Sequence, residues 1–186
     1  MTTFAVRAAE PGDVPDLMRL KHLLAEAENS VHALRATEAD WLRDGFGVRP
    51  GFSAFVAETA SAASGDAILM GMATCSQRVI TGWNGPVVFL QDLFVEVAYR
   101  GCGVGRALTG RVAALACELG SPIVELTVRA DNPAQQFYRR NGFQALPQCL
   151  TYVLAGADLA ALAQDGKPDS AQVSKQDSKS KLALAG

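Results

Sequence analysis

Residues 87–105 read Val-Val-Phe-Leu-Gln-Asp-Leu-Phe-Val-Glu-Val-Ala-Tyr-Arg-Gly-Cys-Gly-Val-Gly, and this stretch predicts how the chain folds. It opens with aliphatic and aromatic residues, a composition typical of a strand that is buried on both faces. Glycines then stand at alternate positions, 101, 103 and 105. Beyond them, apolar residues recur at the spacing of a helix with one buried face: Val104, Leu108, Val112, Leu115 and Leu119. The order is therefore strand, glycine loop, helix.

The glycine loop is a candidate anion site. The first N–H groups of a helix have no acceptor within the helix and lie at the positive end of its dipole. Glycine lets the backbone come close to a phosphate because it has no Cβ. A plain glycine-rich connection is the alternative. The loop is not a Walker loop, since no Gly-Lys-Ser/Thr follows, and its glycines lack the G-x-G-x-x-G spacing of a dinucleotide site.

Length and composition indicate one globular domain. The chain has 186 residues, of which 49% are hydrophobic and 19% charged, and its net charge is −2. No cluster of Lys and Arg forms a stripe, which argues against nucleic acid or a membrane surface as the main partner. No apolar run approaches the roughly 20 residues that cross a bilayer. The start of the chain also lacks the apolar block of a signal peptide, so we expect a cytoplasmic protein.

The four cysteines, at positions 75, 102, 117 and 149, show no Cys-x-x-Cys spacing and no nearby histidine cluster. We therefore expect reduced thiols and no metal site. Only Cys102 lies in the glycine loop.

The remaining pattern alternates strands with helices. Strands are expected at 4–8, 53–58, 67–76, 87–95, 123–129, 143–146 and 149–154. Helices are expected after Asp13 and Thr37 as N-caps, after the glycine loop, and from Asn132 to Asn141. The order predicts a mixed α/β sheet with a parallel crossover around the long helix. A polar, mixed-charge composition begins near Gln164, which predicts a domain over 1–163 and a disordered tail over 164–186.

Two motifs resemble those of the GNAT N-acetyltransferases. Residues 100–105, Arg-Gly-Cys-Gly-Val-Gly, are similar to the acyl-CoA pyrophosphate loop of that family, Arg/Gln-x-x-Gly-x-Gly/Ala. Residues 131–143, Asp-Asn-Pro-Ala-Gln-Gln-Phe-Tyr-Arg-Arg-Asn-Gly-Phe, resemble its second motif, Ala-x-x-Phe-Tyr-x-x-x-Gly-Phe. Residues 44–47, 55–58 and 90–95 are most similar to the diamine/spermidine and thialysine acetyltransferases. The resemblance covers about residues 4–152.

The resemblance implies an α/β (α+β) GNAT-like fold, in which a mixed, mostly antiparallel sheet of six to seven strands is splayed at its middle and flanked by about four helices. It implies acetyl-CoA as co-substrate, no metal, and a homodimer. The implied cofactor contacts are Leu93, Phe94 and Val95 on the splayed strand; Arg100, Gly101, Cys102, Gly103, Val104, Gly105 and Arg106 in the loop; and Asp131, Asn132, Ala134 and Tyr138 in the second motif. Whether Asp131 or Asn132 touches the cofactor is open.

The implied reaction is direct attack of a neutral primary amine on the thioester through a tetrahedral intermediate. Tyr138 is the implied general acid for the leaving thiolate; packing beside Phe137 is the alternative role. An amine with a pKa of about 10.4 is only about one part in 2,500 neutral at pH 7, a deficit near 4.6 kcal/mol, so a base is useful. Asp92 and Glu28, with His32, are the candidate bases, and water is the alternative.

The acceptor is expected to contact Glu28, Trp83, Gln91 and Asp92. Trp83 either lines a pocket or is exposed at its turn. Polyamine-type enzymes carry Glu-Asp where this chain has Gln91-Asp92, and a further acidic position reads Thr81. Fewer anions disfavour a dication, so a thialysine-like amino acid is favoured over a diamine or polyamine. The alternatives are a non-catalytic acyl-CoA-binding regulatory module and a protein or peptide N-acetyltransferase.

Overall fold

The computed structural model describes residues 3–60, 67–82 and 85–165. The chain divides into two parts, Met1–Gly142 and Phe143–Gly186, which are described separately. Trp83 and residues 166–186 of the expected tail lie outside the described residues.

A five-stranded sheet forms the centre of the first part, in the order β1-β2-β3-β4-β5 among the described residues. Its strands are β1 (Ala5–Ala8), β2 (Ser53–Ala60), β3 (Ala67–Val79), β4 (Pro86–Val95) and β5 (Val124–Glu125). Neighbours from β1 to β4 are antiparallel, and β4 pairs with β5 in parallel. The parallel pair needs a crossover, which the helix after the glycine loop supplies.

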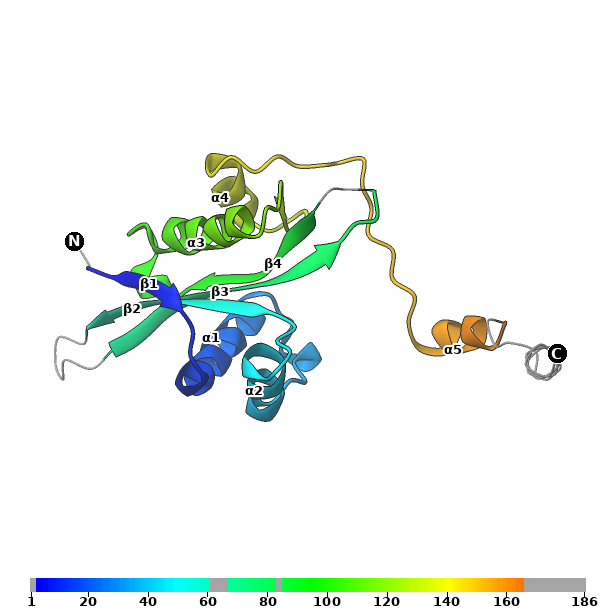
Figure 1. The fold of residues 1–186 in the computed structure, drawn as a ribbon, viewed down its shortest axis with the longest axis horizontal. Coiled ribbons are helices and arrows are strands. Elements are labelled where there is room, and N and C mark those ends of the chain that lie inside the picture. Colours follow the sequence, from blue (N-terminus) through cyan, green and yellow to red (C-terminus); the bar gives the residue numbers. More distant parts are fainter. Residues whose placement is uncertain (1–2, 61–66, 83–84, 166–186) are drawn as a thin grey trace, which may run out of the picture. The chain divides into compact units, whose positions relative to one another are not determined.

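Helices cover both faces of this sheet (Figure 1). One face carries α1 (Val14–Ala27) and α2 (Glu38–Phe46), and the other carries α3 (Val104–Glu118) and α4 (Ala134–Arg140). Short 3-10 turns lie at Pro11–Asp13, Val31–Ala33 and Val97–Tyr99. Each face has its own core: Val14, Leu17, Leu20 and Phe94 are buried on the α1 side, and Leu90, Val104, Leu108 and Val112 on the α3 side. The predicted apolar face of the long helix is thus confirmed.

A β-bulge in β4 changes which side chains face α1. Leu90 is opposite Cys75 and Asp92 is opposite Thr74, so Gln91 is an extra residue without a partner on β3. An extra residue reverses the alternation of side chains beyond it. Asp92 therefore lies on the α1 face with Phe94, whereas an unbroken strand would place it on the α3 face with Leu90.

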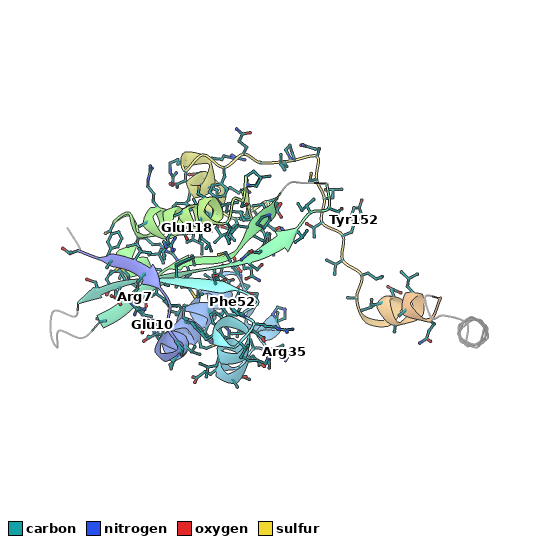
Figure 2. The ribbon with its side chains drawn as sticks, in the orientation of Figure 1. Arg7, Glu10, Arg35, Phe52, Glu118 and Tyr152 are labelled. Atoms are coloured by element: carbon teal, nitrogen blue, oxygen red, sulfur yellow. The ribbon has the colours of Figure 1, made fainter. Side chains whose placement is uncertain are left out.

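An ion-pair network joins β1 to the start of α1. The Arg7 guanidinium donates to both oxygens of Asp13, at 2.7 and 2.9 Å, and to Glu58 on β2 at 2.8 Å. The Glu10 N–H also donates to Asp13, at 2.7 Å. Arg7 and Glu10 are labelled at this junction in Figure 2. Asp13 was expected to cap α1, but its side chain makes no such bond, because both oxygens are taken by Arg7 and Glu10.

The second part contains α5 (Gly156–Asp165), preceded by extended chain. The predicted strands over 143–146 and 149–154 are wrong, since no strand occurs in the described residues after Glu125. A strand needs a neighbour for its backbone groups, and none of these residues has a strand partner. Leu150 and Tyr152 are exposed, and Tyr152 is labelled in Figure 2. Phe143 is half-buried.

The predicted fold class is confirmed, with different counts of elements. The sheet is mixed and mostly antiparallel, but the described residues form five strands instead of six or seven, and five α-helices instead of about four. The expected strand over 123–129 is limited to Val124–Glu125 because β4 and β5 diverge directly after their two paired positions.

Candidate active site

The glycine loop presents a row of unused backbone donors at the start of α3. Gly101 has φ 79° and Gly103 has φ 90°, a left-handed backbone that glycine adopts without strain. Helical hydrogen bonding begins with Ala107, whose N–H donates to Gly103 at 3.0 Å. Among the described residues, the N–H groups of residues 101–106 donate to no acceptor. Together with the helix dipole, they form a site that suits a phosphate.

Gly105 is required by packing rather than by its backbone angle. A Cβ at this position would lie 3.3 Å from the ring of Phe137 and 3.7 Å from Val95. The start of α3 therefore packs directly against α4, which brings the glycine loop and the second motif together. The side chain of Arg106 is exposed at the same helix start.

The second half of β4 has an open edge. β5 pairs only with Val88 and Phe89, so in the described chain no strand covers β4 beyond that point. The backbone N–H of Glu96 donates to the Met70 carbonyl at 2.9 Å. By the alternation of an antiparallel ladder, this turns the backbone groups of Leu93 and Val95 away from β3 and toward the open edge. The Val95 carbonyl accepts a bond from Arg100 Nε at 2.9 Å, which ties the loop to this edge.

Tyr138 comes to the same edge from α4. Its half-buried ring packs on the α3-side core and lies edge-on to Phe137, with ring centroids 5.4 Å apart. Burial raises the pKa of its phenol, and the negative charges of Glu28 and Asp92 raise it further. These charges belong to Glu28, which follows the last residue of α1, and to Asp92 on β4. With its pKa raised, the phenol holds its proton at neutral pH.

Asp92 is fully engaged on the α1 face. Lys21 Nζ on α1 lies 2.6 Å from Asp92 Oδ1, and the Thr74 hydroxyl donates to Oδ2 at 2.9 Å. The Asp92 side chain is 15% exposed. Two donors on its two oxygens fix the orientation of this carboxylate.

Glu28 ends α1 and faces a small pocket. Its backbone N–H donates to Leu24 at 3.1 Å, while its carboxylate makes no hydrogen bond or ion pair among the described residues. The pocket has a volume of about 120 Å³ and is lined by Lys21, Glu28, Ser30 and four apolar side chains. Of the two carboxylates near Tyr138, Glu28 is thus the one that is open to a ligand.

Asp131 and Asn132, the two candidates for the cofactor contact in the second motif, have different local partners. Asn132 Oδ1 accepts from the N–H of Ala134 at 2.8 Å and so caps α4. Asp131 is exposed and pairs with Arg129 at 2.7 Å. The hydrogen bonds to Asp131 raise the pKa of Arg129, and the negative charge of Glu28 adds a smaller effect.

Comparison with known proteins now identifies this arrangement. The sequence model of the GNAT acetyltransferase domain matches residues 50–145, which include β2 to β5, the glycine loop and α4. The chain belongs to the GNAT acetyltransferases. The predicted family is confirmed, and with it the prediction that the protein is an acyltransferase enzyme.

Two curated relatives are named as the kinds of acetyltransferase that the sequence motifs resemble. Thialysine N-epsilon-acetyltransferase of Mus musculus is 32% identical over 151 residues, which are 80% of this chain and 88% of that protein. Spermidine/spermine N(1)-acetyltransferase-like protein 1 of Homo sapiens is 36% identical over 116 residues, 62% of this chain. The chain spans only 17% of the length of that human protein.

The fold is also that of solved acetyltransferases. The aminoglycoside N-acetyltransferase AAC(6')-Iy, solved in complex with CoA, superposes with a TM-score of 0.64 at 19% identity, over 83% of this chain and 96% of that one.

Sequence reasoning missed three polar side chains around the site: Lys21, Thr74 and Arg129. Lys21 had a usable signal, because it lies one turn from Leu17 and Leu24 on the apolar stripe of its helix, where a cation is unexpected. Thr74 and Arg129 had none. Gln91, expected at the acceptor, is exposed in the bulge.

Among the described residues, no group of three or more His, Cys, Asp or Glu side chains could hold a metal ion. None of the described helices combines the length and apolar character of a membrane span.

Proposed function

We propose that this GNAT enzyme transfers the acetyl group of acetyl-CoA to a primary amine of a small molecule, by direct attack. The open edge of β4 carries the proposal, and it is supported by Tyr138, whose pKa the charges of Glu28 and Asp92 raise. The main-chain groups of this edge, the Tyr138 phenol and the Glu28 carboxylate would supply the oxyanion donor, the acid and the base that acyl transfer to an amine needs.

Acetyl-CoA would extend from the glycine loop to the β4 edge. The N–H groups of residues 101–106, with the exposed Arg106 guanidinium, would hold the pyrophosphate. Main-chain groups of Leu93 and Val95 would bind the pantetheine arm and the thioester, beside the buried Phe94. Cys102 and Val104 belong to the same turn, and Asn132 shapes the start of α4 beside it. CoA in the solved aminoglycoside enzyme supports this cofactor.

The reaction then proceeds by proton transfers between named groups. Glu28, the carboxylate open to a ligand, takes the proton from the ammonium directly or through a water; Asp92 is less suited because Lys21 and Thr74 occupy it. The neutral amine attacks the thioester carbon, and a main-chain N–H stabilises the oxyanion, an effect of about 3 kcal/mol in acyl transfer. The C–S bond breaks, and the Tyr138 phenol gives its proton to the CoA sulfur. The attacking nitrogen loses its extra proton as the amide forms, and this proton returns through water to the Tyr138 phenolate.

The acceptor we propose is a thialysine-like amino acid or a diamine or polyamine, since the relatives are named for these substrates. We further propose that the enzyme acts as a homodimer in the cytoplasm, as the family resemblance implies. Light scattering after size-exclusion chromatography would test the homodimer.

Tyr138→Phe tests the proposed chemistry. General acid catalysis contributes about 10²- to 10⁴-fold, so kcat measured by CoA thiol release should fall in that range while the Kd for acetyl-CoA stays within about twofold. Tyr152→Phe is the matched control, because Tyr152 is exposed in the second part of the chain, and its kcat should not change. A wild-type protein that binds acetyl-CoA tightly but acetylates no amine in a broad panel would show a regulatory module instead.

A further inference from the structure

The acceptor cleft holds a lysine that the proposed chemistry does not use. Lys21 lines the pocket with Glu28, and its side chain is 26% exposed. Its ammonium lies 2.6 Å from Asp92, which Thr74 holds from the other side. A partly buried, fixed cation beside the place where an ammonium substrate must bind is unfavourable for a purely cationic acceptor.

Lys21 also has donors to spare. An ammonium carries three N–H donors and no acceptor. Among the described residues Asp92 is its single partner, so two donors remain for a ligand in the pocket. Asp92, which Thr74 holds in place, fixes the position of the Lys21 ammonium. The ammonium is therefore preorganised to bind an anion.

The charges of the cleft match a molecule with both signs. The Lys21 ammonium and the Glu28 carboxylate line the pocket, and the Asp92 carboxylate pairs with that ammonium at 2.6 Å. The charges of these three groups sum to one negative unit. A diamine with two positive charges could pair with Glu28, but Lys21 already neutralises the charge of Asp92. In an amino acid with a side-chain ammonium, the carboxylate could pair with Lys21, and the ammonium groups could lie near the remaining negative charge of the site.

We propose that Lys21 is a specificity-determining residue whose ammonium binds the carboxylate of the acceptor, so that the enzyme acetylates an amino acid with a side-chain primary amine in preference to the corresponding diamine. The inference rests on the proposed acetyltransferase function. It narrows the acceptor class and assigns a role to a side chain that reaches the pocket from α1.

The test compares substrates that differ only in the carboxylate. The pairs are L-lysine with 1,5-diaminopentane, L-ornithine with 1,4-diaminobutane, and S-(2-aminoethyl)-L-cysteine with bis(2-aminoethyl) sulfide. Purified full-length enzyme is assayed with acetyl-CoA by thiol release. We expect kcat/KM to be at least about tenfold higher for the amino acid of the preferred pair, since a charge-assisted hydrogen bond is lost with the carboxylate.

Lys21→Met should remove this preference through KM. The contact exists before and during the reaction, so KM for the amino acid should rise roughly 10- to 100-fold with kcat nearly unchanged. The diamine should be used as well as before or better, because Asp92 is freed. Lys21→Arg keeps the charge and should keep most of the preference. Glu26→Gln, on an exposed position of α1 outside the pocket, should change neither substrate.

The outcomes separate the inference from the function. Equal losses on both members of a pair, a wild-type preference for the diamine, or turnover only on amines outside all three pairs would overturn the role of Lys21 while leaving an acetyltransferase. No turnover on any amine would overturn the proposed function itself. Should Lys21→Met fail to fold, the double variant Lys21→Met/Asp92→Asn removes both charges. The ratio within a pair is its readout, and a preference kept in that variant would contradict the proposal.

Discussion

Replacing Gly103 by alanine should lower the stability of the protein and its affinity for acetyl-CoA. Gly103 is the N-cap of α3 and has φ 90°. A Cβ there would meet nothing within 4 Å, so the cost is backbone strain alone, about 1–2 kcal/mol for a left-handed residue. If the loop keeps its shape, this amount is lost from the free energy of unfolding. If it relaxes to negative φ, the N–H groups of the loop turn away from the phosphate and affinity falls.

Gly110→Ala is the matched control, since it makes the same substitution on the same helix. Gly110 is exposed inside α3, also has open space around its Cβ, and lacks a positive φ. Alanine in a helix interior stabilises by about 0.5–1 kcal/mol relative to glycine. The two variants should therefore shift in opposite directions and differ by about 1.5–3 kcal/mol.

Urea denaturation gives both free energies, provided that the m-values agree with that of the wild type. Titration calorimetry with acetyl-CoA gives the affinities, and Gly110→Ala should leave the affinity unchanged. The reasoning is refuted if Gly103→Ala matches the wild type in both stability and binding, or if the two variants shift stability in the same direction.

Three further predictions concern other parts of the fold. Hydrogen bonds from Arg7 hold the pKa of Asp13 below its ordinary value, against partial burial, so Asp13 stabilises the fold above its unfolded pKa of about 3.9 and loses this effect as pH falls through its folded pKa. Stability measured by circular dichroism should therefore fall less steeply from pH 6 to pH 2 in Asp13→Asn than in the wild type. Gly71→Ala would place a Cβ 2.8 Å from the Phe94 carbonyl oxygen, and should lower the free energy of unfolding by about 1–3 kcal/mol in urea; an unchanged midpoint would contradict that packing. Burial raises the pKa of the Cys75 thiol to about 11, so a thiol reagent at pH 8 should label the other three cysteines, which are exposed, and reach Cys75 only after denaturation; rapid labelling of all four would show that the core opens there.

Sequence predicted best the elements whose signals are local. The helix over Val104–Glu118 follows from apolar spacing within its own residues. Thr37 was likewise predicted as the N-cap of α2, and its side chain accepts from the N–H of Asp40 there. The last two predicted strands failed for the opposite reason. Their apolar alternation is real, but a strand forms only where a distant edge accepts its backbone groups. No local sequence pattern indicates whether such an edge is present.

The same difference between local and distant signals applies to the candidate site. The motif residues could be named because the glycine loop and α4 are contiguous segments. The structure packs Tyr138 against the α3-side core. The partners of Asp92 could not be named. Lys21 is 71 residues away in sequence, and nothing near either residue predicts that pair.

The bulge at Gln91 explains why the roles of the two acceptor-side carboxylates differ. Counting by twos from Leu90 would place Asp92 on the α3 face, away from Lys21, and both carboxylates would then be candidates for the base. The extra residue turns Asp92 to the α1 face, where Lys21 and Thr74 occupy both of its oxygens. The carboxylate best suited to take a proton from the acceptor is then Glu28, and Asp92 becomes the group that holds Lys21 in place. A deletion of Gln91 that left the fold intact should therefore disturb acceptor choice before it disturbs acetyl-CoA binding, since the glycine loop lies beyond the end of β4.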